Sequence, residues 1–388
     1  MKKIAVIRGA NLNKFEMQTH EALKSFFHIE AFCIIQNDFS LEEIDLPIHK
    51  FWGVEVFFPN FLKRYKRYYD FLFNFWLDIP QPMFGIKKKL KGFDILHVED
   101  ITYYYSYQAA KAKRKYGYKL VAAHSENVPY LRGRNWLAKK RISQTIQEID
   151  LFLPRSERAK EVLLLSGVSE EKIEIIPHAI DTDVFKPQSR DLPLCDKYGI
   201  DQDELLILYV GRIARSKGMC ELIYAFKKLV QDLQLKSRRI KLMMAGSGPL
   251  LRRIKRVISE LNLDRYVVIP GNLEYREIPK IHNLADIFVM PSIPTRWGQE
   301  KFGIAIIESM ACAKPVISTL SGSIPEVVGE AGILVPPADF LSLYQAIKRL
   351  ILDETLRMKL GQMAKTRVEK NFSVSIVAKK LKEIYRSL

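Results

Sequence analysis

Two glutamates eight positions apart, Glu300 and Glu308, are the residues whose types and spacing most directly suggest chemistry. The apolar run 287–290 predicts a strand, so Glu300 lies in the loop at its carboxyl end, and Glu308 falls more than one turn inside a helix expected over 303–311. A carboxylate at Glu308 can accept paired hydrogen bonds from a vicinal diol such as that of a ribose, and the helix start suits a phosphate. Glu300 would then face a sugar beyond the diphosphate. Two solvated surface glutamates are the alternative, since this spacing alone is a weak signal.

Two cations follow another expected strand, 205–210. Arg212 comes directly after Gly211, and Lys217 stands just before Gly218, so both flank a strand-to-helix turn. An arginine fork and a lysine point charge together suit a diphosphate. No Asp-x-Asp motif appears in a matching loop, so the two cations would neutralise charge where a metal does so elsewhere. The alternative is a helix start with ordinary surface bases.

Two further strand ends carry weaker signals. The turn after strand 241–245 contains Gly246 and Gly248, which by themselves are more often structural than ligand-binding and do not complete a dinucleotide fingerprint. Glu99 and Asp100 end the expected strand 94–98, where a carboxylate could bind acceptor hydroxyls. A helix-start pair favoured by the helix dipole is the competing interpretation.

The elements that position these residues alternate between short apolar strands and amphipathic helices, and the alternation occurs twice. In the first half the expected strands are 3–7, 29–35, 94–98, 120–123 and 151–154, and the expected helices 19–27, 104–116 and 157–166. In the second half the expected strands are 205–210, 241–245, 266–269, 287–290, 315–318 and 332–335, and the expected helices 216–233, 249–261, 278–283, 303–311 and 323–328. This pattern predicts an α/β protein with two Rossmann-like, doubly wound parallel-sheet domains facing across a cleft, where ligands bind beyond the carboxyl ends of strands. The predicted domains are 1–180, 181–371 and a helix over 372–388 that packs back on the first domain, with a hinge at 177–187.

The charge of the chain is uneven. Of a formal net charge of +17 over 388 residues, the segment 50–141 carries +12, from 19 Lys and Arg against 7 Asp and Glu. Within 57–92, basic and aromatic side chains interleave, and Phe61, Tyr65, Tyr68 and Trp76 recur at helical spacing. A basic amphipathic helix of this kind favours anionic lipid headgroups. A surface helix whose aromatic residues pack on the core is the alternative.

Composition excludes several other classes. Hydrophobic residues make up 48% and charged residues 27% of the chain, which is typical of a soluble globular protein, and no apolar run is long enough to span a membrane. The opening residues predict a first strand rather than a signal peptide. The cysteines stand apart, which argues against a disulfide framework or a structural zinc site and favours the cytoplasm; they are Cys33, Cys195, Cys220 and Cys312.

Taken in order, these motifs resemble the retaining, family 4 type of glycosyltransferase with the GT-B fold (glycosyl transferases group 1). The matching pieces are VGRIARSKG, AGSGP, Glu300–Glu308 as the E-x7-E element, SGSIPE and GILVPP. The connecting segment reads Pro-His-Ala-Ile-Asp where Pro-Asn-Gly-Ile-Asp is commoner. The resemblance is strong from about residue 151 to the end and weaker before it.

The resemblance implies specific roles. Arg212 and Lys217 would hold the diphosphate of a nucleotide-sugar, Glu308 the ribose and Glu300 the transferred sugar. The remaining donor-side candidates are Phe302, Gly303 and Ile304, through their backbone where they approach the donor, with Gly211, Gly246 and Gly248. The acceptor-side candidates are Gly9, Asn11, Asn13, Glu99 and Asp100, and His124 matches a histidine that the family places near the sugar. The opening loop departs from the family because 9–13 lacks the usual glycine pair.

The resemblance therefore predicts a metal-independent, cofactor-free enzyme that moves a hexosyl group to a hydroxyl acceptor with retention of configuration. Its expected partners are a nucleotide-diphosphate sugar, a glycolipid or cell-envelope glycan acceptor, and the anionic inner face of the cytoplasmic membrane. Rival interpretations on the same fold are a nucleotide-sugar epimerase, a protein that acts on nucleic acid, and a catalytically silent relative. Retention of Arg212, Lys217, Glu300 and Glu308 argues against silence, and the aromatic content of 57–92 favours lipid over nucleic acid.

Overall fold

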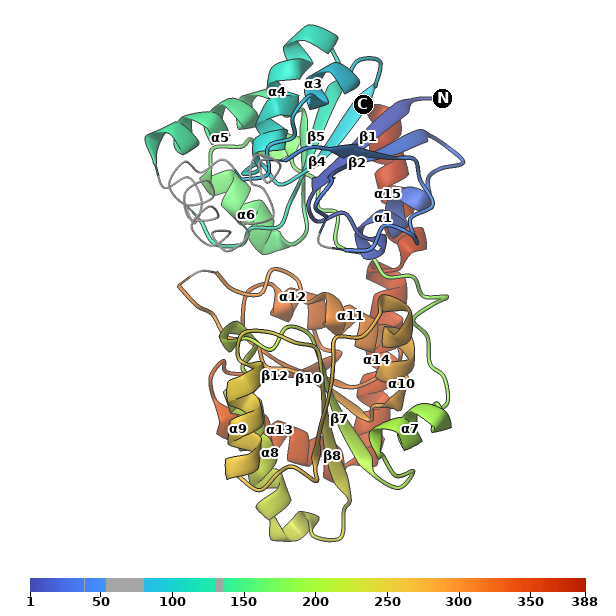
Figure 1. The fold of residues 1–388 in the computed structure, drawn as a ribbon, viewed down its shortest axis with the longest axis vertical. Helices are drawn as coiled ribbons and strands as arrows, with labels where there is room; N and C mark the ends of the chain where they lie inside the picture. The colour runs from blue at the N-terminus through green and yellow to red at the C-terminus, as the bar shows by residue number, and fades with distance from the viewer. Residues whose placement is uncertain (38, 54–79, 130–134, 297) are drawn as a thin grey trace, which may run out of the picture. The chain divides into compact units, whose positions relative to one another are not determined.

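The computed structural model describes residues 1–37, 39–53, 80–129, 135–296 and 298–388, and the chain forms two compact units (Figure 1). The first unit comprises residues 1–179 together with 374–388, and the second comprises residues 180–373. Each unit contains its own parallel sheet. Most of the predicted segment 57–92 lies outside the described residues, because the description resumes only at residue 80.

The sheet of the first unit has six strands within the described residues, in the order β3-β2-β1-β4-β5-β6, and all pairs are parallel. The strands are β1 (Lys3–Gly9), β2 (His28–Ile34), β3 (Ile48–Phe51), β4 (Ile95–Glu99), β5 (Lys119–His124) and β6 (Leu151–Pro154). The helices are α1 (Lys14–Glu21), α3 (Ile86–Lys89), α4 (Tyr104–Tyr116), α5 (Trp136–Glu148), α6 (Glu157–Leu165) and α15 (Val374–Ser387). Apolar clusters on both faces show that the sheet is doubly wound. Helices α3 to α6 contribute to one cluster, and α1 and α15 to the other.

The second unit repeats this plan with the strand order β12-β11-β10-β7-β8-β9. The strands are β7 (Leu205–Val210), β8 (Ile240–Ala245), β9 (Val267–Gly271), β10 (Ile287–Met290), β11 (Val316–Thr319) and β12 (Gly332–Val335). The helices are α7 (Leu192–Tyr198), α8 (Met219–Gln231), α9 (Leu251–Glu260), α10 (Ile278–Leu284), α11 (Ile304–Ala311), α12 (Ile324–Val328), α13 (Phe340–Leu352) and α14 (Glu354–Asn371). In Figure 1, α8, α9 and α13 lie on one side of this sheet and α10, α11 and α14 on the other. The strand order reverses at β7, so the loops after β7 and β10 diverge at the sheet's switch point.

These two sheets confirm the predicted fold of two Rossmann-like domains. Five predicted elements have the bounds seen in the structure, namely β6, β7, β10, β12 and α4. One helix prediction is wrong: the first helix runs from Lys14 to Glu21 rather than over 19–27. Asn13 starts it early by accepting a hydrogen bond from the Glu16 amide at 2.9 Å, and the apolar spacing beyond it belongs to a turn whose Leu23 and Phe27 are buried. The sequence prediction also missed β3, α3, α5, α7, α13 and α14.

The C-terminal helix α15 is part of the first unit's core. Val377, Leu381 and Tyr385 are buried among residues of α1 and the sheet. Tyr385 is fully buried, and its hydroxyl lies 2.6 Å from Nδ1 of His97 in β4. None of the helices in the described parts of the chain combines the length and apolar content needed to cross a bilayer.

Candidate functional site

The loops that follow β7 and β8 pack backbone against backbone, and glycine makes this possible. A side chain at Gly246 would place its Cβ 2.0 Å from the carbonyl oxygen of Gly211, and one at Gly248 would meet that of Ile213 at 2.4 Å. The amide of Gly211 donates to the Ala245 carbonyl at 2.9 Å, and that of Ile213 donates to the Ser247 carbonyl at 2.8 Å. The glycines therefore bring the two loops together at the carboxyl edge of the sheet. Direct contact of Gly211, Gly246 or Gly248 with a donor stays a prediction.

Lys217 and Glu300 form an ion pair, although they are 83 positions apart in the chain. Lys217 ends a short 3₁₀ turn (Arg215–Lys217) after β7, and Glu300 lies in the loop after β10. The hydroxyl of Ser292 donates to the same glutamate oxygen at 2.9 Å. A side chain at Gly218 would clash with the Pro291 carbonyl at 2.0 Å, which shows how closely the two loops approach. The cation expected for the diphosphate and the carboxylate expected for the sugar thus meet at one point.

Arg212 occupies the same loop as Lys217 but has a different environment. It is exposed, and among the residues that the structure describes no acidic group pairs with it. Its backbone carbonyl accepts a hydrogen bond from the hydroxyl of Tyr209 at 2.7 Å. Burial, with a smaller contribution from the charge of Glu300, raises the pKa of Tyr209, so this hydroxyl stays a donor. The loop is therefore anchored from below while the guanidinium remains accessible.

Glu308 lies inside α11 and is only 5% exposed, with Nε2 of His282 3.4 Å from its Oε2. Glu300 is also largely buried, at 12% exposure of its side chain, so the alternative of two solvated surface glutamates is wrong. Gly303 caps α11 with φ of 91°, and its Cβ would meet the Ile306 side chain at 2.8 Å. The ring of Phe302 is buried edge-on against Phe372. A donor contact by Phe302 would therefore come from its backbone, as predicted, and contacts of Gly303 and Ile304 with a donor stay a prediction.

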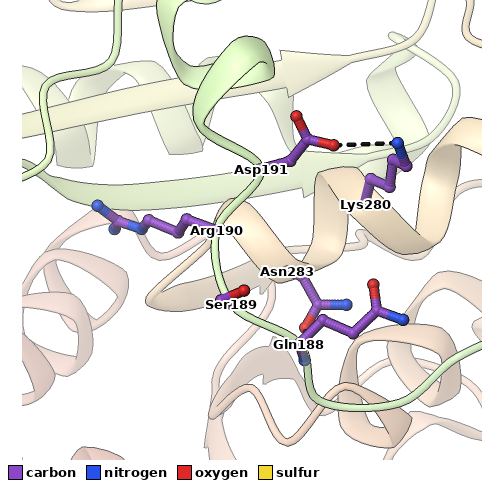
Figure 2. A pocket seen from close by; sticks show the side chains of 6 residues that line it. All are labelled: Gln188, Ser189, Arg190, Asp191, Lys280 and Asn283. Carbon is purple, nitrogen blue, oxygen red and sulfur yellow. Dashed lines mark hydrogen bonds and ion pairs between the residues drawn. The ribbon is translucent and has the colours of Figure 1, made fainter.

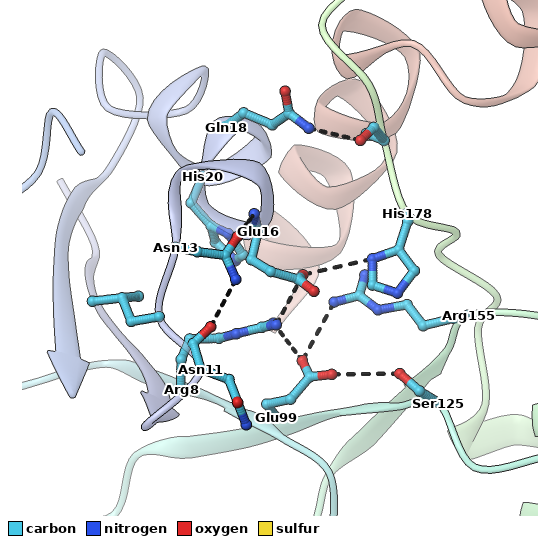
Figure 3. A network of polar contacts seen from close by, with 12 residues as sticks. Arg8, Asn11, Asn13, Glu16, Gln18, His20, Glu99, Ser125, Arg155 and His178 are labelled. Atoms are coloured by element: carbon cyan, nitrogen blue, oxygen red, sulfur yellow. Dashed lines mark hydrogen bonds and ion pairs between the residues drawn. The ribbon is translucent and has the colours of Figure 1, made fainter. Parts of the chain in front are cut away.

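In the first unit, the charged residues at strand ends form a buried network (Figure 3). Arg8, near the end of β1, pairs with Glu99 at the end of β4 and, at 2.8 Å, with Glu16 in α1. Arg155, after β6, reaches the same Glu99 oxygen at 3.5 Å, and His178 lies 3.5 Å from Glu16. The two arginines are 3% and 7% exposed. Glu99 is thus held by two arginines and is not the helix-start carboxylate of the alternative interpretation.

Burial and the charges of this network shift the pKa values of several of its side chains and of two neighbouring histidines. Burial alone would lower the pKa of Arg8, but the charges of Glu16 and Glu99 outweigh it and raise that pKa. Burial would raise the pKa of Glu16, but chiefly the charge of Arg8 holds it well below its usual range. Burial, assisted by the two arginines, lowers the pKa of His20 to about 3 and that of its neighbour His97 well below 6.5. Both imidazoles are therefore neutral near pH 7, while Arg8 and Glu16 stay charged.

Asp100 and His124 lie close together at the carboxyl ends of β4 and β5. Nδ1 of His124 is 3.7 Å from an Asp100 oxygen, and His124 is 2% exposed. Asp100 adopts φ of 58° and accepts hydrogen bonds at 3.0 Å from both the amide and the hydroxyl of Thr102. Neither ring nitrogen of His124 has a hydrogen-bond partner within the described residues. The structure brings these two predicted site residues together but does not link them by a hydrogen bond.

The two asparagines of the loop after β1 form hydrogen bonds that hold the loop and the start of α1 in place. Asn13 caps α1 and donates at 2.9 Å to the carbonyl of Asn11, whose amide lies 3.4 Å from the Tyr103 hydroxyl. Gly9 adopts φ of 59°, and its Cβ would lie 1.9 Å from the side-chain oxygen of Gln81. Contact of Gly9, Asn11 or Asn13 with an acceptor stays a prediction.

Sequence reasoning missed several polar residues of both regions. They are Ser292 and His282 in the second unit and Arg8, Glu16, Arg155 and His178 in the first. Arg8 carried a usable signal, because an arginine inside an otherwise apolar central strand requires a buried partner. The others lie on loops and helices where polar residues are ordinary.

A pocket elsewhere in the second unit carries no assignment. It has a volume of about 420 Å³ and is lined by Gln188, Ser189, Arg190, Asp191, Lys280 and Asn283 (Figure 2). Asp191 pairs with Lys280 at 3.0 Å, and Arg190 pairs with Asp286. Its charged groups are thus satisfied by protein partners, and it contains none of the predicted site residues.

Comparison with known proteins agrees with this architecture. The model of the family "Glycosyl transferases group 1" matches residues 194–367, and that of "Glycosyltransferase Family 4" matches residues 48–184. The chain belongs to the group 1 glycosyltransferases and has the GT-B fold of two Rossmann-like domains. This confirms the predicted family.

Similar proteins include the alpha-D-kanosaminyltransferase of Streptomyces kanamyceticus, 27% identical over 65% of this chain and 64% of that protein. The capsular polysaccharide biosynthesis glycosyltransferase CapM of Staphylococcus aureus is 31% identical over 60% of each chain. The chain thus spans about three fifths of the length of these relatives. Among solved structures, Anabaena HepE in complex with UDP superposes with a TM-score of 0.78 at 17% identity, covering 100% of both chains. A glycosyltransferase from Rickettsia africae gives 0.76 at 23% identity, covering 100% of this chain and 98% of that one.

Proposed function

We propose that the protein transfers a hexosyl group from a nucleotide-diphosphate sugar to a hydroxyl acceptor, with retention of anomeric configuration and without a metal. One observation carries the proposal: Lys217, Glu300 and Ser292 meet at the carboxyl edge of one sheet, with Arg212 exposed on the same loop as Lys217. These residues lie at the carboxyl ends of the strands, which is where ligands bind in doubly wound sheets. The family and the UDP complexes of HepE support a nucleotide-sugar as donor.

On this proposal the second unit binds the donor. Arg212 and Lys217 stabilise the negative charge that gathers on the leaving diphosphate as the glycosidic bond breaks, assisted by the amide groups at the start of α11. Glu308 accepts hydrogen bonds from the ribose hydroxyls, and Glu300 accepts them from the sugar.

The ion pair between Lys217 and Glu300 couples these two tasks. A diphosphate competes with Glu300 for the lysine ammonium, and when the lysine turns to the phosphate, the carboxylate becomes available for sugar hydroxyls. Ser292 keeps one oxygen of Glu300 in place during this exchange, because its hydroxyl donates to that oxygen. An intact donor therefore satisfies both partners at once, whereas a bare sugar satisfies only one.

The first unit binds the acceptor in this proposal. His124 and Asp100 are its strongest candidates, because the buried ring nitrogens of His124 lack hydrogen-bond partners within the described residues. Glu99 is a weaker candidate, because Arg8 and Arg155 already occupy it. The arginines instead fix the loop that carries Asp100.

The test is release of nucleoside diphosphate from a panel of UDP-, GDP- and ADP-hexoses, with and without glycan and lipid-linked acceptors. We expect release from one donor class to rise on addition of an acceptor and to survive EDTA. NMR of the product should show the donor's anomeric configuration. Sugar interconversion without acceptor would indicate an epimerase, and no turnover with any donor would contradict the proposal.

We also propose peripheral contact with the anionic inner face of the cytoplasmic membrane, with a glycolipid or envelope glycan as acceptor. Helix α5 supports this, because it begins with exposed Trp136 and Leu137, 69% and 56% exposed, beside the exposed Lys139 and Lys140. Tryptophan with lysine is a pairing suited to the lipid interface. Co-sedimentation with vesicles containing phosphatidylglycerol should exceed that with phosphatidylcholine and weaken in Trp136→Ser. Equal binding to duplex DNA at matched salt would favour nucleic acid instead.

A further inference from the structure

A fully buried histidine stands directly behind Glu308. His282, in α10, is 0% exposed, and its Nε2 lies 3.4 Å from Oε2 of Glu308 in α11. Within the described residues no other side chain forms a hydrogen bond or ion pair with this carboxylate. The pair joins two helices that follow different strands, so it is a tertiary contact rather than a local one.

The surroundings of the ring decide which nitrogen carries the proton. Nδ1 of His282 is buried without a hydrogen-bond partner among the described residues, and the rings of Phe288 and Phe185 lie 5.4 and 6.2 Å from the imidazole. A proton on Nδ1 would be a buried donor with nothing to accept it, which is costly. The favourable tautomer therefore carries its proton on Nε2 and donates it to Glu308.

This contact restricts the carboxylate. An oxygen held by one N–H keeps a lone pair free, so Oε2 can accept a second hydrogen bond while Oε1 accepts another. Without His282 the carboxylate could rotate about its last torsion, which has a broad energy profile. The two hydroxyls of a vicinal diol can each donate to one carboxylate oxygen only when the carboxylate group is turned so that both of its oxygens face the diol. Rotation of the carboxylate therefore matters most for this kind of ligand.

We propose that His282 is a positioning residue that orients Glu308 for the two hydroxyls of a ribose and thereby lets the site select ribonucleotides over deoxyribonucleotides. The inference rests on the proposed function, in which Glu308 meets the ribose. It concerns the geometry of recognition and not the chemical step, so His282 should affect donor affinity more than the turnover number.

The experiment compares each of UDP, GDP and ADP with its 2′-deoxy form by calorimetry on the full chain. The wild type should bind the ribonucleotide of its preferred base about tenfold or more tightly than the deoxy form, as loss of a hydrogen bond to a charged group predicts. His282→Phe keeps an aromatic ring between Phe288 and Phe185 but removes the donor, and the ratio should fall to about threefold or less. His282→Gln, whose amide can donate from nearly the position of Nε2, should retain most of the ratio. In steady state, His282→Phe should raise KM for the donor several-fold with little change in kcat.

Phe288→Leu is the packing control, because Phe288 packs against the His282 ring and has no group that could donate a hydrogen bond to Glu308. It should lower stability and leave the ribose-to-deoxyribose ratio unchanged. A folded His282→Phe protein with the wild-type ratio would overturn the inference while leaving the proposed function intact. If no nucleoside diphosphate binds the wild type, the proposed function and the inference fall together.

A second measurement applies even if His282→Phe does not fold. In the wild-type protein labelled with 15N-histidine, the ring signal that is absent from His282→Gln should be that of an imidazole with its proton on Nε2. The full chain has seven histidines, so the His282 signal is assigned by comparison with the spectrum of His282→Gln. A ring protonated on Nδ1 would overturn the inference.

Discussion

The two units place charged residues at the same kind of position, the carboxyl ends of parallel strands, yet they treat those charges differently. In the first unit Arg8 is 3% exposed and is shared between Glu16 and Glu99. In the second unit Lys217 has only Glu300 as its acidic partner within the described residues and keeps 24% of its side chain exposed. Location at a strand end therefore does not by itself define a ligand site.

This comparison indicates that a cation available for ligand binding differs from a structural cation in having fewer acidic partners and a more exposed side chain. A buried arginine between two carboxylates has its charge balanced by protein groups, and removing it strands two anions. A half-exposed lysine with one partner can exchange that partner for a phosphate at little cost. We thus expect substitution of Arg8 in the first unit to act on stability and substitution of Lys217 in the second to act on turnover.

Arg8→Met tests the first half of this comparison and should have the largest effect. It leaves Glu16 and Glu99 buried without their main cation, and breaking a buried pair in this way costs about 3–5 kcal/mol. Hydrogen exchange of β1 amides, which reports on opening of the first unit, should show this loss of protection. Arg212→Met is the matched control, because Arg212 is exposed, and it should leave stability within about 0.5 kcal/mol of the wild type. Equal effects of the two substitutions would remove the distinction between the units.

Lys217→Ala tests the other half. It removes a cation from the proposed diphosphate site, and loss of one such electrostatic group lowers kcat about 10²–10³-fold. The melting temperature should fall less than in Arg8→Met, because Lys217 is partly exposed and the hydroxyl of Ser292 still donates to Glu300 in the variant. Arg215→Ala, which removes an exposed arginine paired with Glu221 at 3.2 Å, should leave kcat unchanged. Near-normal turnover in Lys217→Ala would exclude the diphosphate clamp.

The fold could be predicted from sequence because its signals are local. Short apolar runs bounded by glycine, proline or polar residues located β7 and β10 to the residue, and helical spacing did the same for α4. The error at α1 arose where a capping asparagine decided the start while apolar residues of the following turn imitated helical spacing. Strand β3 was missed because its sequence, IHKF, has too few apolar residues to stand out.

The site was predictable only as a set of separate motifs. Spacing identified Glu300, Glu308, Arg212 and Lys217, but it could not show that Lys217 and Glu300 pair, because that contact joins loops from two strands. His282 was invisible for the same reason: its meaning depends on Glu308, 26 positions later. Sequence patterns of this kind do not reveal contacts between residues that are far apart in the chain.

The stability of the first unit should also depend on pH, and this effect is expected to be smaller than those of Arg8→Met and Lys217→Ala. Burial lowers the pKa of His20 to about 3, from about 6.5 in the unfolded chain. Between these values the unfolded chain binds a proton that the folded unit does not, so stability is full above pH 6.5 and declines as the pH falls toward 3. His97 shifts in the same direction and adds to the slope. The lowered pKa of Glu16 acts only below about pH 4.5, so it does not affect the range from pH 7 to 5.

From pH 7 to 5 we therefore expect His20 alone to account for a loss of about 2 kcal/mol, measured as protection of the β1 amides against hydrogen exchange. His20→Gln should reduce the slope by this amount, because glutamine does not titrate. His28→Gln is the matched control, because His28 is an exposed histidine of the same unit and lies outside the buried cluster of His20 and His97. Amides of β7 in the second unit provide the comparison, because residues 180–373 contain one histidine, whereas the first unit contains the two buried imidazoles of lowered pKa, His20 and His97. If amide protection declined equally with pH in β1 and β7, the buried histidines would not determine the acid sensitivity of the first unit. The proposed difference between the two units, buried charge pairs in the first and accessible charges in the second, would then lose this support.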